Sequence, residues 1–185
     1  MEPARALDAE RLESDRLVLE PLSVEHANEL ARVLDDPALH RFTGGTPSSA
    51  AELRVRFEAQ TQGRSPDGRA LWLNWVVRER ASGRLVGTVQ ATVKTANPTP
   101  VADLAWVIGT SHQGNGFAKE AAAAMAAWLR EQGVRRLRAN IHPRHEASNQ
   151  VARSIGLQET GTIVDGELRW ESVQPANPPP DAQGA

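Results

Sequence analysis

Two glycines, Gly114 and Gly116, lie between a segment that predicts a strand and a segment that predicts a helix. The first segment, Val101–Ile108, is apolar and β-branched, which indicates a strand buried on both faces. From Phe117 onward, apolar residues recur at helical spacing. Glycines at such a junction let backbone N–H groups approach a ligand, and the free N–H groups and dipole of a helix start favour an anion. The junction is therefore a candidate phosphate site.

The glycine spacing by itself leaves two readings open. The third glycine of the dinucleotide-binding fingerprint is missing, and Lys119 is not placed as in a Walker loop. A purely structural turn is the alternative to a phosphate site. Lys119 likewise has two readings, contact with a phosphate or a solvated position on the helix surface.

Two longer patterns include these glycines. The run Gln113-Gly-Asn-Gly-Phe-Ala118 resembles the Gln/Arg-x-x-Gly-x-Gly/Ala signature of the GNAT family of N-acetyltransferases. Glu146-Ala-Ser148, followed by Val151 and Ile155-Gly-Leu157, is similar to the Asn-x-Ala-Ser…Val…Gly-Phe segment of the branch with ribosomal-protein N-terminal acetyltransferases. The resemblance covers residues 14–173, in layout only for the first half, and implies an acyltransferase that uses acetyl-CoA.

The resemblance also implies where acetyl-CoA binds. In the family the glycine loop surrounds the pyrophosphate, and pantetheine lies along the preceding strand like an added strand. His145 stands where relatives carry a cofactor-contacting asparagine, and imidazole can also hydrogen-bond. The expected cofactor-binding residues are Trp106, Val107 and Ile108 through their main chain, together with Gln113, Gly114, Asn115, Gly116, Phe117, Ala118, Lys119, His145 and Ser148.

Asp103 is the candidate general base. It is an acidic residue within an otherwise apolar strand, where an unpaired carboxylate is costly. Its place matches a glutamate with which many relatives remove the amine proton, usually through water, although aspartate is one methylene shorter. A carboxylate paired with a neighbouring arginine is the other reading.

Ser148 is the candidate group for the departing thiolate. Many relatives protonate the thiolate with a tyrosine on the helix after the fifth strand. This sequence contains no tyrosine and has Ala152 at about the corresponding place. A thiol with a pKa of about 8.5 needs only about 1.4 kcal/mol of help to leave as thiolate near pH 7.5. A serine hydroxyl or water therefore suffices, and helix capping by Ser148 is the compatible alternative.

Periodicity and turn residues predict one domain with the element order β-α-α-β-β-β-α-β-α-β-β. We expect Ser23 to cap a helix that runs to about Leu34, and residues 37–49 to be irregular. Gly133 should end the long helix, and Asp165-Gly166 should form a type I′ hairpin turn. We expect a flexible segment at residues 1–13, the domain at 14–173 and a disordered, proline-rich tail at 174–185. The resemblance implies the GNAT fold of the α/β (α+β) class, a mixed, strongly bent seven-stranded sheet with helices on both faces. Its fourth and fifth strands, expected at 101–108 and 136–141, splay apart to admit the cofactor.

Composition excludes several classes of function. The 185 residues include no cysteine, so disulfides, thiolate metal sites and cysteine nucleophiles are excluded. A formal net charge of −2 gives no electrostatic reason to expect nucleic acid or an anionic membrane as a partner. His142 and His145 have no further ligands of suitable spacing, so we expect no metal. We expect a cytoplasmic monomer or homodimer.

These readings combine into one expected activity, direct transfer of acetyl from acetyl-CoA to a primary amine. The expected acceptor is a small molecule, such as an aminated metabolite or antibiotic. Two alternatives stay open, an acetyltransferase for protein or peptide N-termini and a non-catalytic acyl-CoA-binding regulatory domain.

Overall fold

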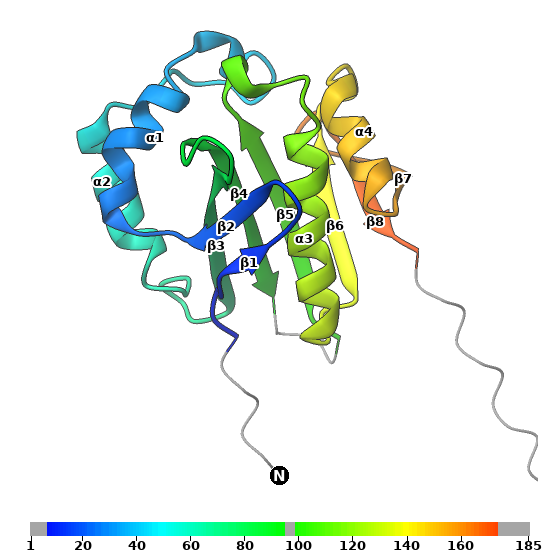
Figure 1. The fold of residues 1–185 in the computed structure, drawn as a ribbon. Helices are drawn as coiled ribbons and strands as arrows, with labels where there is room; N and C mark the ends of the chain where they lie inside the picture. The colour runs from blue at the N-terminus through cyan, green and yellow to red at the C-terminus, as the bar shows by residue number, and fades with distance from the viewer. Residues whose placement is uncertain (1–6, 95–98, 174–185) are drawn as a thin grey trace, which may run out of the picture.

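The structure, a computed structural model, describes residues 7–94 and 99–173 (Figure 1). The expected tail at 174–185 lies outside the described residues. The elements are β1 (Leu12–Glu13), β2 (Leu17–Pro21), η1 (Val24–His26), α1 (Ala27–Val33), η2 (Pro37–His40), α2 (Ala50–Gln60), β3 (Ala70–Glu79), β4 (Leu85–Lys94), β5 (Val101–Ile108), η3 (Thr110–His112), α3 (Phe117–Glu131), β6 (Arg136–Ile141), α4 (Glu146–Ser154), β7 (Leu157–Val164) and β8 (Glu167–Ser172).

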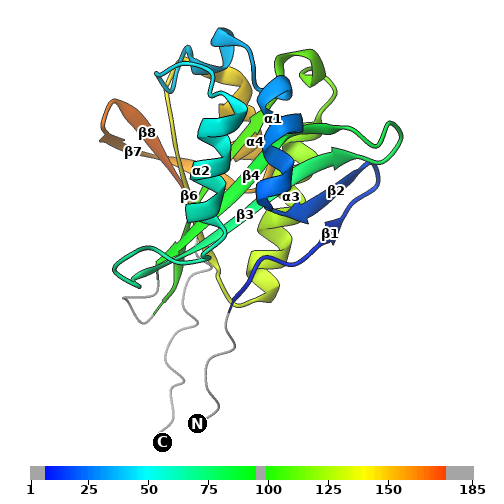
Figure 2. The same cartoon turned by 90° about the vertical axis from the view of Figure 1, so that its left-hand side faces the viewer.

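The described strands form one sheet in the order β1-β2-β3-β4-β5-β6-β8-β7. Every neighbouring pair is antiparallel except β5 and β6, which are parallel. Helices α1 and α2 cover one face of the sheet, and α3 and α4 cover the other (Figures 1 and 2). The mixed sheet with helices on both faces confirms the expected fold.

The described sheet has eight strands, one more than expected, and the additional strand is β1. Leu12 pairs with Leu19 of β2, and Leu7, Ala9 and Leu12 pack against the main core. The indole Nε1 of Trp75 donates to the Glu10 carbonyl at 2.7 Å. Residues 7–13, which we expected to be flexible, are therefore part of the packed structure, because a few small apolar side chains and one buried indole hold them there.

Two separate hydrophobic clusters fill the two sides of the sheet. The larger one joins α3 and α4 to the strands and includes Met125, Leu129 and Trp170. The smaller one joins α1 and α2 to Val76 and Leu85. Each helical layer thus has a core of its own.

Several local signals in the sequence are confirmed. Helix α3 buries one face and stops before Gly133, whose φ of 85° suits a residue after a helix end. Asp165 and Gly166 both have positive φ, 50° and 83°, as a type I′ turn between β7 and β8 requires.

The helix expected at 23–34 is shorter, because Ser23 caps a 3-10 turn, η1, before α1 begins at Ala27. Among the residues that follow, η2 lies in the segment expected to be irregular.

Strands β5 and β6 splay apart as expected. Their ladder has only three pairs, Val101 with Arg136, Ala102 with Leu137 and Asp103 with Arg138. Beyond these pairs β5 continues to Ile108, fully paired with β4 on its other edge. We name the space between the diverging strands the wedge. Ala105 and Val107, on the same face of β5, are exposed, so β5 is not buried on both faces as predicted.

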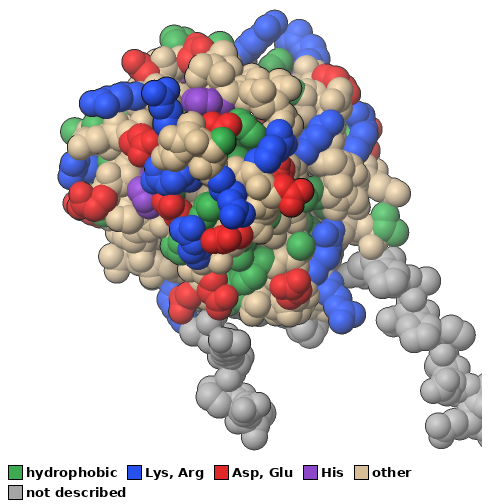
Figure 3. All heavy atoms as spheres, viewed as in Figure 1, with side chains coloured by type: hydrophobic (Ala, Val, Ile, Leu, Met, Phe, Trp, Pro, Cys, Tyr) green, Lys and Arg blue, Asp and Glu red, His purple; other side chains and the backbone are tan. Residues whose placement is uncertain are grey.

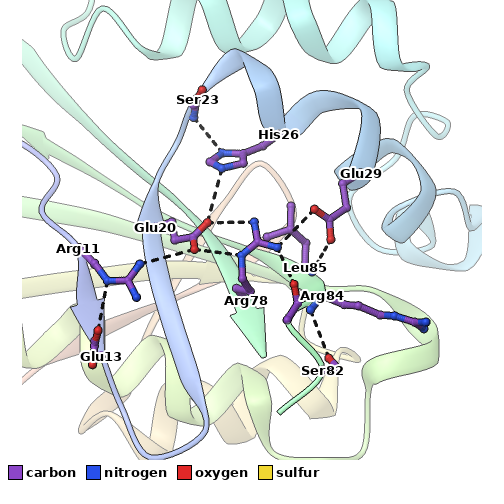
Figure 4. A network of polar contacts seen from close by, with 11 residues as sticks. Arg11, Glu13, Glu20, Ser23, His26, Glu29, Arg78, Ser82, Arg84 and Leu85 are labelled. Carbon is purple, nitrogen blue, oxygen red and sulfur yellow. Dashed lines mark hydrogen bonds and ion pairs between the residues drawn. The ribbon is translucent and has the colours of Figure 1, made fainter. Parts of the chain in front are cut away.

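A polar network anchors α1 to the sheet (Figure 4). The Arg78 guanidinium donates to both Glu20 oxygens at 3.0 Å and lies 3.4 Å from Glu29, while the other Glu29 oxygen accepts the Leu85 N–H at 2.8 Å. The bond from Arg78 is the main reason that the pKa of Glu20 is lowered. The position of α1 over β2, β3 and β4 is therefore set by charge-assisted bonds as well as by packing.

Candidate active site

The glycine loop after β5 is open and carries donors. Gly114 and Gly116 both have positive φ, 80° and 78°, and Gly116 precedes α3 without any side-chain cap. Residues 113–116 are exposed, and a Cβ on Gly114 would meet nothing within 4 Å. The first N–H groups of a helix have no partner inside the helix. The loop therefore presents free donors and a positive dipole end to solvent, which suits a phosphate group.

Side chains of the loop hold its shape. The Gln113 amide donates to the Ile108 carbonyl at 2.9 Å, and the Asn115 amide donates to the His112 carbonyl at 3.1 Å. The Phe117 side chain is buried in the core, so only its main chain is available to a ligand. Lys119 is exposed on α3. Gln113 and Asn115 thus shape the loop through their side chains.

Arg16, which the sequence analysis did not single out, holds the loop in place from the turn just before β2. Its guanidinium donates to the Asn115 carbonyl at 2.9 Å and pairs with Glu120 at 2.7 Å, and it lies 5.0 Å from the centre of the Phe117 ring. Burial raises the pKa of Glu120, but bonds from Ser14 and Arg16 outweigh it, so the pKa is lowered overall. No local pattern marks Arg16, because its partners lie about a hundred residues away in the sequence.

Main-chain groups on the open edge of β5 face the wedge. The Gly109 N–H donates to the Val86 carbonyl at 2.9 Å, which makes these two residues a hydrogen-bonded pair. Antiparallel pairing alternates, and the register of β4 with β5 is regular. The main-chain groups of Val107 are therefore directed to β4, and those of Trp106 and Ile108 are directed into the wedge. Three residues were expected to contact the cofactor through their main chain. Val107 is the exception, because its main chain is paired with β4 and its side chain faces the other side of the sheet.

Asp103 lies at the closed end of the wedge, where β5 and β6 still pair. Its Oδ1 accepts from Arg138 at 2.7 Å and its Oδ2 lies 2.9 Å from Lys94 Nζ. The carboxylate thus has the arginine partner of the alternative reading, and a lysine in addition. Removing a proton from a substrate would require Asp103 to give up one of these contacts.

Ser148 and His145 meet at the open end of the wedge, at the start of α4. His145 is the N-cap residue, and its Nδ1 accepts the Ser148 N–H at 3.4 Å. Its Nε2 lies 3.2 Å from the Ser148 hydroxyl oxygen. Burial lowers the pKa of the His145 imidazole, which keeps the ring neutral near pH 7. The helix is therefore capped by His145, and the Ser148 hydroxyl is oriented by an imidazole.

An aromatic contact closes this end. The Phe42 ring, from the segment between η2 and α2, lies 4.5 Å from the His145 ring and 5.1 Å from the His142 ring, between centroids. Segments far apart in the sequence thus meet over the open end of the wedge.

Glu167 is a second carboxyl near this end that the sequence analysis missed. It is the first residue of β8, next in register to His142, because Ile141 pairs with Leu168. Burial raises the pKa of the Glu167 carboxyl, and the nearby His142 partly offsets this. A raised pKa makes this carboxylate a stronger base than an ordinary surface glutamate. Only the fold brings it beside His142, so no local sequence pattern marks it.

A cavity of about 210 Å³ lies on the other side of β5, under α1 and α2. The helices supply apolar walls, including Leu30, Leu53 and Phe57, and β3 and β4 supply a polar floor of Asn74, Thr88 and Gln90. Val107 of β5 also lines the cavity and is 38% exposed. The cavity therefore reaches the strand that borders the wedge.

Three further observations concern metal ligands, membrane-spanning helices and surface charge. In the described part of the chain, no group of three or more His, Cys, Asp or Glu residues could hold a metal ion. None of the helices at 7–94 and 99–173 has the length and hydrophobicity needed to cross a bilayer. On the face seen in Figure 3, basic and acidic side chains are interspersed.

Comparison with known proteins gives a family match and a curated relative. Residues 16–158 match a family model described as "Acetyltransferase (GNAT) domain". A curated relative, "Uncharacterized N-acetyltransferase p20" of Bacillus licheniformis, is 23% identical over 159 residues, which cover 85% of this chain and 88% of that protein.

Two solved structures have similar folds at low identity. The ribosomal-protein-S5-alanine acetyltransferase from Vibrio fischeri has a TM-score of 0.72 at 17% identity and covers 89% of this chain and 96% of its own. The microcin C7 self-immunity acetyltransferase MccE, in complex with acetyl-CoA and AMP, has a TM-score of 0.70 at 17% identity, with 87% and 94% covered.

Proposed function

This chain belongs to the GNAT family of acetyltransferases and depends on acetyl-CoA, and from that premise we propose that its acceptor is the primary amine of a small molecule. The observation that supports a small acceptor is the cavity under α1 and α2. It is concave, has apolar walls with a few polar groups, and reaches β5 at Val107, as a small-molecule site should. The amine would approach β5 from this side, opposite the glycine loop.

The residues of the chain fit acetyl-CoA. The free N–H groups at the start of α3, with Gly114 and Gly116 as the flexible positions, would hold the pyrophosphate. Arg16 and Glu120 fix that loop. The main chain of Trp106, directed into the wedge, would bind pantetheine in place of the missing β6 partner.

Acetyl-CoA supplies a thioester, so the reaction forms a carbon–nitrogen bond and breaks a carbon–sulfur bond. The chain has to take one proton from the amine nitrogen and to stabilise the thiolate. Ser148, oriented by His145, would donate a hydrogen bond to the sulfur. We propose Glu167 for proton removal, because it lies beside His142 at the end of the wedge that carries Ser148, and because both oxygens of Asp103 are held by cations.

The acceptor decides how much this base contributes. Deprotonating an ε-amine of pKa about 10.4 costs roughly 4 kcal/mol near pH 7.5, whereas an α-amine of pKa about 7.7–8.0 costs under about 1 kcal/mol. A site with one partly buried carboxyl therefore favours an amine of low pKa.

The second candidate is acetylation of a protein N-terminus. It is favoured by the similarity to the Vibrio fischeri enzyme, whose description names a ribosomal protein. A chain terminus would have to enter the cavity in extended form, past the segment that carries Phe42.

Release of free thiol from acetyl-CoA, measured with small amines and with N-terminal peptides in parallel, decides between the two candidates. Higher kcat/KM for small amines is the expected result. Turnover confined to peptides would contradict our proposal and support the second candidate. Calorimetry of acetyl-CoA binding to the full chain tests the cofactor assignment independently of any acceptor.

A further inference from the structure

Among the described residues that line the cavity, Arg56 is the one charged side chain, and its charge is positive. The described lining also includes the imidazole of His40, and none of the described lining residues is Asp or Glu. A polyamine or another polycationic acceptor would therefore meet a positive group and no negative one, which disfavours its binding.

Arg56 is available to a ligand. Its Nη2 donates to the Ser48 hydroxyl at 3.0 Å, and it has no ion pair within 4 Å in the described residues. Glu52, one helical turn earlier, would be the usual partner. Its carboxylate is instead used in the capping box of α2, where it accepts from the N–H and hydroxyl of Ser49, both at 2.8 Å. A guanidinium has five donors, so most of those of Arg56 are unused.

The cavity floor also has unused polar groups. Asn74 of β3 and Gln90 of β4 face each other in the sheet register and both line the cavity. Neither side-chain amide, nor that of Gln60 in the wall, makes a hydrogen bond within residues 7–94 and 99–173. Each carboxamide can donate and accept, so together they suit an uncharged polar segment of a ligand.

We propose that the acceptor is a small primary amine that also carries a carboxylate or a phosphate, with Arg56 binding this anion at the edge of the cavity. A guanidinium fork matches the geometry of carboxylate and phosphate oxygens better than that of any neutral group. Asn74 and Gln90 bind the polar middle of the acceptor, and the amine points to β5 at Val107. The inference rests on the proposed function, since it names the substrate class of the same site.

The test uses the full chain and matched probes. We compare alanine with alanine amide, and O-phosphoethanolamine with ethanolamine, with putrescine as the dication, by thiol release at saturating acetyl-CoA. We expect kcat/KM to be at least about tenfold higher for the anionic member of a pair. The two pairs distinguish carboxylate from phosphate as the recognised anion.

Variants locate the effect. Arg56→Gln should remove the preference for the anionic member and raise its KM by about tenfold or more, while the KM for acetyl-CoA stays within about twofold. Arg56→Lys, which keeps the charge but not the fork, should retain part of the preference. Arg54→Gln, on the same helix and outside the cavity lining, is the matched control and should behave as the unchanged protein does.

Three outcomes overturn the inference. These are a preference for putrescine or for the neutral amines, equal KM values in the Arg56→Gln variant and the unchanged protein, and transfer to peptides alone. Failure of the proposed function is distinguishable, because it would appear as absence of acetyl-CoA binding in calorimetry or as binding without transfer to any small amine.

Discussion

The two halves of β5 differ in how fully their polar groups are satisfied. From Val101 to Asp103 the strand is paired on both edges, and its one charged side chain lies between Lys94 and Arg138. From Leu104 to Ile108 one edge is unpaired, and the strand leads to a loop with free N–H groups. This difference shows that a charged side chain alone does not identify the candidate active site. Groups without partners mark it, because a ligand can satisfy only what the fold leaves free.

The largest effect should come from the open side, in the glycine loop. Gly116→Val forces a β-branched residue into a φ of 78° beside Arg16, and acetyl-CoA binding should weaken by about 100-fold or more, because the N–H groups lose their arrangement. Gly83→Val, in the turn before β4 with φ of 68° and open space, is the matched control. Both variants should lose about 1–2 kcal/mol of stability. Calorimetry showing equal acetyl-CoA affinity for the two would contradict the loop assignment.

Substitution of the two carboxyls, Glu167 and Asp103, tests directly which of them acts as the base. Glu167→Gln should lower kcat by about 10- to 100-fold and leave the melting temperature nearly unchanged, since a base has been removed. Because burial raises the pKa of Glu167, the rate of the unchanged protein should fall as pH drops through that raised pKa. In the variant this acidic limb should be absent from a kcat–pH profile.

Asp103→Asn should have the opposite pattern of effects, on stability more than on kcat. It leaves Lys94 and Arg138 facing a neutral amide, so stability should drop by about 1 kcal/mol, while kcat should change by less than about threefold. If instead kcat collapses in Asp103→Asn and persists in Glu167→Gln, the base is Asp103, as the sequence analysis expected.

The contacts of Arg16, made from the turn before β2, should have a moderate effect on the KM for acetyl-CoA. Arg16→Lys keeps a cation near Glu120 but loses the forked contact with Asn115, so the KM for acetyl-CoA should rise by about 3- to 10-fold with kcat unchanged. Steady-state kinetics with acetyl-CoA as the varied substrate gives both values. An equal fall of kcat would show that Arg16 acts on the chemical step.

The leaving-group side should have a modest effect on kcat that depends on pH. Ser148→Ala removes the hydroxyl beside His145, yet a thiol of pKa about 8.5 leaves readily, so kcat should fall by only about 3- to 10-fold at neutral pH. Ser154→Ala, at the far end of α4, removes a hydroxyl that bonds only to the Val151 carbonyl and serves as the control. The deficit in Ser148→Ala should shrink as pH rises above the thiol pKa, and a deficit independent of pH would exclude this role.

The sequence predicted features that depend on neighbours in the chain. The limits of β5 and β6, the turn at Asp165-Gly166 and the stop at Gly133 follow from local residue types, and the structure confirms them. Contacts between distant parts of the chain could not be predicted from the sequence. Arg16 with Asn115, Glu167 beside His142, and Glu10 with Trp75 join residues far apart in the sequence, so no pattern in either segment reveals them.

The separate hydrophobic cluster beneath α1 and α2 has an evolutionary consequence. Leu30, Leu53 and Phe57 pack among themselves and against Val76 and Leu85, and none of the three belongs to the cluster around α3, so we expect mutations among them to spare that cluster. Substitutions in this cluster can then change which amine is accepted while the residues that bind coenzyme A stay the same. Grafting this helical pair from a relative should change acceptor choice without changing the affinity for acetyl-CoA.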